Sequence, residues 1–402
     1  MSDATHRLHA IQAPRPCRAP LSPVAGAFIE SALGLILAFQ IYLCFKFFWS
    51  ADGLHTLSGV PLYGDFKVFW IEARHALDGR IQYDQTALHH EIAKLFSLRF
   101  AFLSYLYPPD YALLLAPFAL LSFQAAGLVW GALGASAYVA GMRSLFGPLP
   151  WLPLIAFTGV SQTLLTGQNS LFTTGLFATS LAYADRAPAI AGLAAAVLAT
   201  KPQLGLLVPV LLIATRHWKA LIAAAIAKSA MIAASVQVFG ISAWSAFLSL
   251  RNEAMAINAG HYRQSVYNIV SNLHGPAWQG YFLQAFSALW ACVVLAMTIR
   301  HTRRNLELAA LGAAATPLIS PMFLDYDLTI LAIPAAYLAL YQRISRADIV
   351  LLAVTFLMPM IARWITIFTH VTAGPFVAAL LLARVASAIR GNDERTIPAR
   401  LS

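Results

Sequence analysis

The chain has 402 residues, of which 59% are hydrophobic and only 11% charged, and its mean hydropathy is +0.67. These are too few charges to cover a soluble surface of this size, so a soluble globular protein is excluded. The formal net charge of +10 does not indicate nucleic-acid binding, because the Lys and Arg residues stand mainly in short loops between apolar runs. We expect a polytopic membrane protein with about ten to thirteen spans.

The N-terminal region indicates the orientation of the chain. Residues 1–23 form a basic, proline-rich tail, and residues 24–49 form the first apolar run. This run is longer than the core of a cleaved signal peptide, which is about 7 to 15 residues. We therefore expect an uncleaved first span with the N-terminus in the cytoplasm, and the positive-inside rule then places the polar loop of residues 50–109 outside.

Two amphipathic helices are predicted in this first external loop, lying on the membrane surface. The first is marked by apolar residues at helical spacing, which are Phe66, Phe69, Trp70, Ala73, Ala76 and Leu77. Gly79 stands where a C-cap glycine would follow this helix. The second helix is expected over residues 86–99.

The rest of the chain reads as a series of spans within one transmembrane domain, residues 24–390, followed by a basic cytoplasmic tail, residues 391–402. Further spans are expected near residues 111–122, 125–146, 149–165, 168–184, 188–214, 219–240, 281–299, 306–322, 327–341, 348–366 and 373–390. A polar stretch, residues 241–279, is expected to form a second external loop. Arginines in the remaining turns place both long loops and the segment 320–327 on the external face.

Five charged residues in or beside apolar runs are candidates for a functional site, namely Asp65, Lys201, Asp325, Asp327 and Arg363. Charges at membrane depth are costly unless they line a wet cavity or meet partners. Each position also has a structural interpretation. Asp65 directly precedes an amphipathic helix and fits its N-cap. Lys201, next to a proline that interrupts an apolar run, fits the cap of a broken helix, and the two late aspartates fit an ordinary external turn.

Short motifs recur in a fixed order along the chain. They are Asp65-Phe66, Phe69-Trp70, Gly79, Tyr83-Asp84, Tyr107-Pro108-Pro109, Gly167-Gln168-Asn169-Ser170-Leu171, Ala191-Gly192, Lys201-Pro202-Gln203, Gln264-Ser265, Ser320-Pro321 and Tyr326-Asp327-Leu328. Over residues 24–390 their order and spacing resemble glycosyltransferase family 87, in the GT-C superfamily. The resemblance implies an all-α polytopic membrane protein, a GT-C-type bundle of about 11–13 transmembrane helices with amphipathic helices in the first external loop.

The family includes polyprenyl-phosphate-mannose-dependent α-mannosyltransferases. The resemblance therefore implies transfer of a sugar, mannose, from a polyprenyl-phosphate donor to a lipid or glycan acceptor on the external face of the plasma (inner) membrane. It also implies a first-loop aspartate as general base, which falls on Asp65. Donor-phosphate or sugar contacts are assigned to Lys201, Arg363, Arg263, Gln168, Asn169, Tyr107, Gln264, Asp325 and Asp327. Some relatives have a histidine after Ser320-Pro321, but this chain has none there, so no histidine role is carried over.

The chemistry of such a transfer suits these residue types. A hydroxyl is too weakly acidic to be deprotonated beforehand by a carboxylate with a pKa of about 4, so Asp65 must take the proton as the new bond forms. The departing phosphate gains negative charge, which Lys201, Arg363 or Arg263 would stabilise. Displacement from the opposite face inverts the anomeric centre. We expect no metal or other cofactor, and as partners the lipid-linked donor, the acceptor and membrane lipids, but no nucleic acid.

Alternatives from other classes remain open at this point. A lipid-linked sugar flippase or other transporter would also be polytopic and basic, but its site should lie near the midplane between repeated halves, and no convincing internal repeat is detected. A membrane scaffold protein would not need carboxylates and a lysine at one face. An O-antigen-ligase-type enzyme should have its large external loop late in the chain, whereas here the longest polar loop is the first.

Overall fold

The computed structural model describes residues 23–49, 52, 54–57, 62–97, 104–257 and 263–396. Residues 1–22 of the predicted N-terminal tail and residues 397–402 of the predicted C-terminal tail lie outside the described residues. The regular secondary structure of the described ranges is helical, and β-type pairing there is limited to isolated bridge residues, such as Arg263, which pairs with Leu324. This confirms the prediction of an all-α protein.

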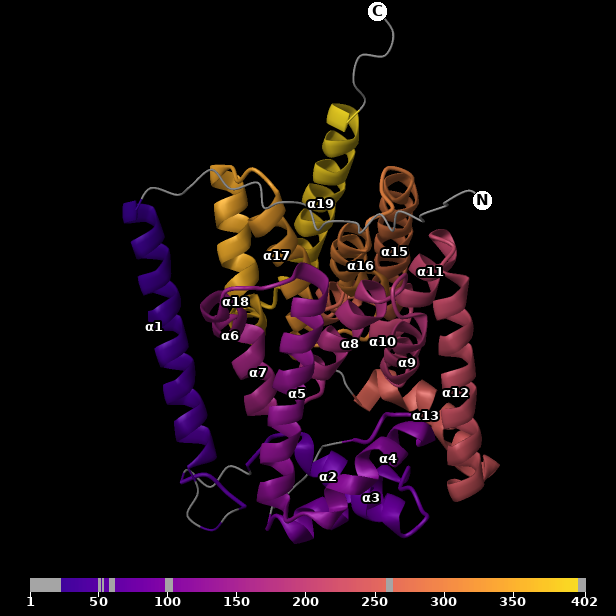
Figure 1. The fold of residues 1–402 in the computed structure, drawn as a ribbon. Coiled ribbons are helices and arrows are strands. Elements are labelled where there is room, and N and C mark those ends of the chain that lie inside the picture. The colour runs from indigo at the N-terminus through magenta and orange to yellow at the C-terminus, as the bar shows by residue number, and fades with distance from the viewer. Residues whose placement is uncertain are drawn as a thin grey trace, which may run out of the picture.

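The described helices follow one another along the chain, and Figure 1 labels most of them. They are α1 (Pro23–Phe48), α2 (Phe66–Leu77), α3 (Gln85–Leu95), α4 (Pro109–Leu115), η1 (Ala116–Leu120), α5 (Phe123–Phe146), α6 (Trp151–Ala156), α7 (Thr158–Thr166), α8 (Ser170–Ala182), α9 (Pro188–Leu198), α10 (Pro202–Gly205), α11 (Leu207–Ala214), α12 (Trp218–Phe239), α13 (Ile241–Ile257), α14 (Val266–Asn272), α15 (Ala277–Ile299), α16 (Asn305–Ile319), η2 (Asp325–Leu331), α17 (Ala332–Tyr341), α18 (Arg346–Thr369) and α19 (Gly374–Thr396).

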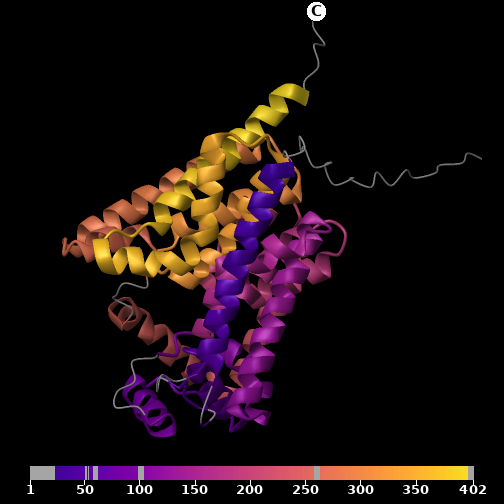
Figure 2. The same ribbon diagram turned by 90° about the vertical axis from the view of Figure 1, so that its left-hand side faces the viewer.

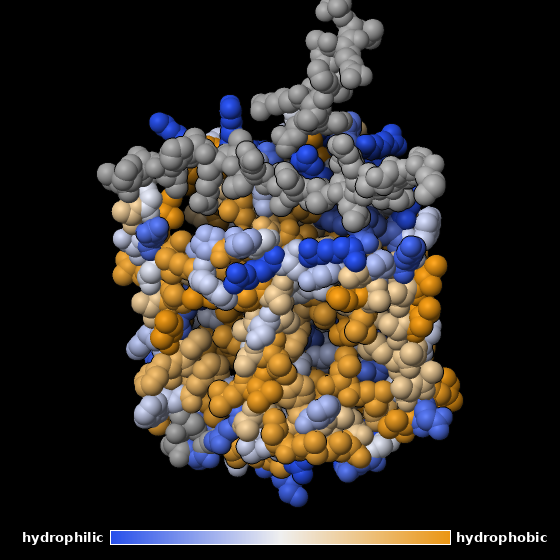
Figure 3. Space-filling model, in the orientation of Figure 1, coloured by the Kyte–Doolittle hydropathy of each residue, from blue (hydrophilic) through white to orange (hydrophobic). Residues whose placement is uncertain are grey.

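Six helices in the described part of the chain are long and apolar enough to cross a membrane, namely α1, α5, α12, α15, α18 and α19. Figure 3 shows the matching surface, a belt of hydrophobic residues between polar residues at the two ends of the molecule. The protein is therefore a polytopic membrane protein, as predicted. Whether the remaining apolar helices complete the expected 11–13 crossings stays a prediction.

Several of the remaining apolar helices are too short to cross a bilayer alone. The helices α8, α9 and α16 have 13, 11 and 15 residues. At the rise of an α-helix these lengths correspond to about 20, 16 and 22 Å, against a hydrocarbon core of about 30 Å. Each short helix adjoins a break in the chain, so polar residues at these breaks are placed inside the bundle instead of at its surface.

The two ends of the molecule differ in composition. At the end where α1 begins and α19 finishes, the turns between helices carry most of the arginines, and we call it the basic end (Figure 1). Hydrogen bonds join neighbouring turns at this end. Asp185 accepts from His217 at 2.8 Å and from Asn305 at 2.8 Å. The helices α2, α3 and α4 lie at the opposite end, which we call the loop end.

The positive-inside rule predicts that the basic end is cytoplasmic and the loop end external. We test this with Arg80→Cys, at an exposed position of the first loop, and with Lys219→Cys, exposed at the basic end. Both are made in a background with Cys17, Cys44 and Cys292 changed to serine. An impermeant maleimide added to intact cells or spheroplasts should label Arg80→Cys alone, and after lysis both. Labelling of Lys219→Cys alone in intact cells would reverse the orientation.

The first-loop helices differ slightly from their prediction. Helix α2 has the predicted bounds, and Gly79 follows it with a φ of +70°. Its apolar face is buried against η1 and α4, so α2 is held within the protein instead of lying only on the bilayer surface. Helix α3 ends at Leu95 because Ser97 has a φ of +48°, which is incompatible with a continuing helix, and residues 98–99 of the prediction lie outside the described residues.

Two other segments also differ from the sequence prediction. The stretch predicted as the second external loop, residues 241–279, contains α13, which is apolar over its first ten residues, and α14. The predicted span over residues 149–165 is divided into α6 and α7, because Phe157 adopts an extended ψ of 121°. Hydropathy alone missed both features, since it reports apolar content but not a local change of backbone direction.

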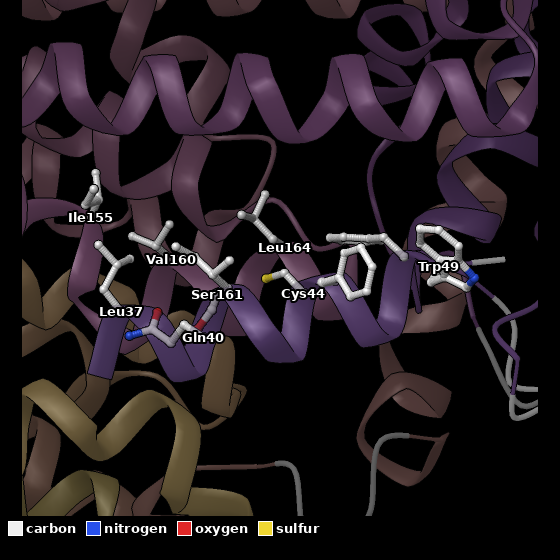
Figure 4. Close-up of a pocket in the computed structure, with 11 residues that line it drawn as sticks. Leu37, Gln40, Cys44, Trp49, Ile155, Val160, Ser161 and Leu164 are labelled. Atoms are coloured by element: carbon white, nitrogen blue, oxygen red, sulfur yellow. The ribbon is translucent and has the colours of Figure 1, made fainter. Parts of the chain in front are cut away.

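Helix α1 runs along the side of the bundle, as Figure 2 shows, and leaves an apolar groove between itself and the pair α6 and α7. The groove has a volume of about 510 Å³. Figure 4 shows Cys44, Ser161 and Leu164 on its walls, together with Gln40, whose side-chain amide donates to the Ala156 carbonyl at 2.7 Å. None of the predicted site residues lines this groove, so the candidate site lies elsewhere.

Candidate active site

The site is built on a close crossing of two chain segments, residues 63–66 at the start of α2 and residues 166–168 at the end of α7. The Asp65 amide donates to the Thr166 carbonyl at 2.7 Å. Both segments contain a glycine with positive φ, Gly64 at +44° and Gly167 at +67°. A Cβ atom on Gly64 would lie 2.5 Å from the Thr166 oxygen, and one on Gly167 would lie 2.0 Å from the Tyr63 oxygen. The crossing therefore requires glycine at both positions.

This close approach predicts the effect of Gly167→Ala. A positive φ alone costs alanine about 1–2 kcal/mol, and the clash with the Tyr63 carbonyl adds about 1–3 kcal/mol. Gly79→Ala is the matched control, because Gly79 has a similar φ of +70° but its nearest atom to an added Cβ is 4.0 Å away. Thermal unfolding in detergent should show a clearly larger loss of stability for Gly167→Ala. Equal losses would mean that the crossing is not tightly packed.

Asp65 is held at this crossing by its side chain. Its backbone is in the right-handed helical region, with φ −78° and ψ −11°, and its carboxylate makes no capping hydrogen bond to α2. The carboxylate oxygen Oδ2 accepts from Nε2 of Gln168 at 2.7 Å. Trp130 in turn donates to the Gln168 carbonyl at 3.3 Å and so fixes this segment. The interpretation of Asp65 as a side-chain N-cap is therefore wrong.

Lys201 lies in the link between α9 and α10, with a side chain that is 2% exposed. Its Nζ donates to Oδ1 of Asp327 at 2.6 Å and to Oδ1 of Asn169 at 3.0 Å. Asp327 also accepts from the Ser170 hydroxyl at 2.8 Å. The breaks between α7 and α8, between α9 and α10, and after α16 thus each contribute a residue to one buried cluster around this ion pair. Lys201 stands at the N-cap position of α10, but its side chain makes no capping hydrogen bond and is used in this ion pair, so a helix cap does not account for it.

Tyr107 joins this cluster through Asn169. The Asn169 side-chain amide donates to the Tyr107 hydroxyl at 3.2 Å and to the Tyr111 hydroxyl at 3.1 Å. The two tyrosine rings stack with centroids 4.5 Å apart, and Phe69 of α2 packs edge-on against Tyr107. The Tyr107-Pro108-Pro109 motif therefore places the Tyr107 phenol in the site immediately before α4, which begins at Pro109.

A second ion pair lies beside the first. Arg363 of α18 donates through Nε to Oδ2 of Asp325 at 2.7 Å, and Gln162 of α7 donates to the same oxygen at 3.3 Å. The ring of Tyr326, the residue between the two aspartates, lies 5.1 Å from the Lys201 ammonium. Both aspartates are buried and paired, so their interpretation as ordinary residues of an exposed turn is wrong.

Gln264 and Arg263 lie outside the cavity wall and stabilise the segment that carries these aspartates. Arg263 forms an isolated bridge with Leu324, and the backbone N–H of Gln264 donates to the Phe323 carbonyl at 2.6 Å. The Gln264 side chain donates to Thr366 at 3.2 Å and accepts from the Gly374 amide at 3.0 Å. The oxygen and nitrogen of its side-chain amide are thus both hydrogen-bonded within the protein. This argues against the predicted contact of Gln264 with substrate.

A cavity of about 310 Å³ lies between the first-loop helices and the three breaks. It is lined by Asp65, Val68, Phe69, Ser104, Leu106, Tyr107, Gln168, Thr200, Lys201, Pro202, Gln203, Phe247, Leu248, Leu250, Met322, Leu324 and Tyr326. Four predicted site residues line this cavity, namely Asp65, Tyr107, Gln168 and Lys201. Asn169 and Asp327 contact Lys201 from outside the cavity wall. Tyr326 was not assigned a site role from the sequence, although it stands in one of the quoted motifs.

The Asp65 carboxylate lies outside the membrane-spanning helices, and three positive charges act on it. Burial raises the pKa of Asp65, and the hydrogen bond from Gln168 and the charges of Lys67, Arg363 and Lys201 oppose that rise. A carboxylate with a raised pKa is a stronger base than one in water, provided that it remains ionised. The arrangement is therefore suited to taking a proton from a group bound in the cavity.

The sequence profile of glycosyltransferase family 87 matches residues 105–321. The chain belongs to glycosyltransferase family 87. Searches of curated proteins and of solved structures find no significant match. The matched range of this family 87 protein includes Tyr107, Gln168, Asn169, Lys201, Arg263 and Gln264. Asp65, Asp325, Asp327 and Arg363 lie outside that range.

Membership of family 87 makes this polytopic protein a membrane glycosyltransferase. Such an enzyme uses a sugar donor and an acceptor. The membership favours the predicted enzyme over the transporter and scaffold alternatives. Because Asp65 and three other site residues lie outside the matched range, their place in the family 87 site rests on the geometry described above.

Proposed function

We propose that this family 87 enzyme transfers a sugar, mannose, from a polyprenyl-phosphate donor to a hydroxyl of a lipid or glycan acceptor, with inversion and with Asp65 as general base. One observation carries the proposal. The Asp65 carboxylate and the Lys201 ammonium line the same cavity, one on the α2 side and the other at the break between α9 and α10. A displacement that needs a base at one end and a cation at the other fits this arrangement.

Asp65 acts on the acceptor. The acceptor oxygen forms a bond to the anomeric carbon while the bond from that carbon to the phosphate oxygen breaks, and the hydroxyl proton passes to the Asp65 carboxylate. Gln168 holds that carboxylate through Oδ2, so Oδ1 is the oxygen available to the acceptor. Attack from the face opposite the phosphate inverts the anomeric centre, which converts a β-linked donor into an α-linked product.

Lys201 acts on the donor phosphate. An ammonium has three N–H donors, and Asn169 and Asp327 use two of them. The third is left for a phosphate oxygen in the cavity. Negative charge grows on that oxygen as the bond to the sugar breaks, so a fixed cation favours the transition state over the bound donor. In this proposal Arg363 supports the site from behind the wall, through its ion pair with Asp325.

The cavity also suits a donor that is part lipid. Its polar wall carries Asp65, Gln168 and Lys201, whereas Phe247, Leu250 and Met322 form an apolar wall. A polyprenyl phosphate has the same two parts, a charged headgroup and an apolar chain. The cavity lies toward the loop end, so the predicted topology places transfer on the external side of the plasma (inner) membrane.

The proposed function is tested with membranes that contain the overexpressed enzyme. Polyprenyl-phosphate sugars are offered one at a time, and glycosylated lipids and glycans are detected by mass spectrometry. We expect a product that depends on the enzyme with polyprenyl-phosphate mannose, and none in membranes that carry Asp65→Asn. A product formed from a nucleotide sugar, but from no polyprenyl-phosphate sugar, would contradict the proposed donor class.

A further inference from the structure

Lys67 is a buried lysine directly behind the proposed base. Its side chain is 4% exposed, and its Nζ donates to the carbonyl oxygen of Gly64. That carbonyl carbon is bonded to the amide nitrogen of Asp65, so the ammonium is held beside the Asp65 backbone. The ring of Phe96 covers it, with 5.9 Å from Nζ to the ring centroid. Lys67 does not line the cavity, so it cannot touch substrate there.

A buried ammonium normally requires a carboxylate partner. In the described part of the chain Lys67 forms no salt bridge at contact distance, and the carboxylate nearest to it along the chain is Asp65, two residues earlier. The Asp65 oxygens instead face Gln168 and the cavity. The ammonium and the carboxylate thus interact through space, without an ion pair at contact distance.

We propose that Lys67 is a positioning residue that holds the Gly64–Asp65 turn through its hydrogen bond and supplies one of the positive charges that favour the ionised form of the Asp65 carboxylate. This inference rests on the proposed role of Asp65 as general base. It assigns a function to a residue that would otherwise be a costly buried charge.

The charges around the pair support this role. Three positive charges act on Asp65, those of Lys67 on α2, Lys201 at the break after α9 and Arg363 on α18, and all three oppose the rise of its pKa that burial causes. Burial lowers the pKa of Lys67 to about 8, and the Asp65 charge opposes that fall. His55 is the other titratable group that faces Lys67, and it is hydrogen-bonded to Asp52.

The sign of the effect follows from these directions. Removing the Lys67 charge removes one of the factors that keep the pKa of Asp65 down, so that pKa rises further. A smaller fraction of Asp65 is then ionised at any given acidic or neutral pH, and the acid limb of the rate profile moves to higher pH. Above that limb the rate recovers. A purely structural role would lower the rate at every pH instead.

Carbodiimide labelling measures this ionisation without any substrate. Dicyclohexylcarbodiimide enters membranes and reacts with protonated carboxyl groups, and peptide mass spectrometry identifies the modified residue. The purified full-length enzyme is labelled across a pH series as wild type, Lys67→Met and Lys67→Arg. Lys94→Met is the matched control, because Lys94 is an exposed lysine of the same loop. If Lys67→Met does not fold, Lys67→Gln carries the same test.

We expect the midpoint of Asp65 labelling to move to higher pH in Lys67→Met and to remain at the wild-type value in Lys67→Arg and Lys94→Met. In the transfer assay, the acid limb should move in the same variant and in the same direction. An unchanged Asp65 midpoint in the neutral variants would overturn the inference. A shifted midpoint in an enzyme that transfers no sugar from any polyprenyl phosphate would instead contradict the proposed function while retaining the Lys67–Asp65 coupling.

Discussion

Asp65→Asn is expected to lower turnover by about 100-fold to 10,000-fold, the usual contribution of general base catalysis. Asparagine has nearly the same size, and its carbonyl oxygen still accepts the hydrogen bond that Gln168 makes at 2.7 Å in the native enzyme. It cannot take a proton at neutral pH. The fold and donor binding should therefore survive while the chemical step fails.

The measurement is the initial rate of transfer by the purified variant, together with its donor affinity and thermal unfolding midpoint. Asp84→Asn is the matched control, because Asp84 caps α3 by accepting from the amides of Thr86 and Ala87. Asparagine caps as well as aspartate, so this variant should retain near-normal turnover. Near-normal turnover by a well-folded Asp65→Asn would remove Asp65 from its catalytic role.

The second large effect is expected at Lys201, and it needs a double variant. Lys201→Met alone leaves the Asp327 carboxylate buried without its cation, and breaking a buried pair in this way costs about 3–5 kcal/mol. Loss of activity in that single variant would not separate misfolding from lost phosphate binding. Lys201→Met combined with Asp327→Asn removes both charges together, and the new asparagine oxygen still accepts from Ser170.

We expect the double variant to fold but to transfer sugar about 100-fold to 1,000-fold more slowly, since it lacks the cation that meets the departing phosphate. Thermal unfolding establishes the fold, and turnover with a saturating donor establishes the chemistry. A folded double variant with wild-type turnover would return Lys201 to a structural role.

Local features of the fold were predictable from the sequence. Helix α2 has the predicted bounds because its apolar residues recur every three to four positions and Gly79 ends it, and both signals lie within one short window. The break at Lys201-Pro202 was predictable for the same reason, since proline cannot continue a helix. The first ten residues of α13 were assigned to a polar loop because the charged residues that follow dominated the composition of that stretch.

The pairing of charges was not predictable. Lys201 meets Asp327, which lies 126 residues later in the chain, and Arg363 meets Asp325 only because α18 packs against η2. No local pattern encodes such partners. The placement of Gln264 against Gly374, 110 residues away, was missed for the same reason. The sequence therefore identified residues of the right chemistry but could not distinguish the cavity wall from the residues that support it.

Lys67 illustrates the same limit. Its position two residues after Asp65 is evident in the sequence, but an amphipathic helix at a membrane surface would place such a lysine in solvent. Its burial behind the Gly64–Asp65 turn follows from the packing of α2 within the protein and from the ring of Phe96, which comes from the end of α3.

The anomeric configuration of the product tests the central claim most directly. Purified enzyme is given a β-linked polyprenyl-phosphate mannose labelled with ¹³C at the anomeric carbon, and the one-bond carbon–hydrogen coupling of the product is measured by NMR. Direct displacement with Asp65 as general base predicts an α-linked product. A β-linked product would mean retention through a covalent intermediate or an ion pair, and it would contradict the assignment of Asp65 as the base of a single displacement.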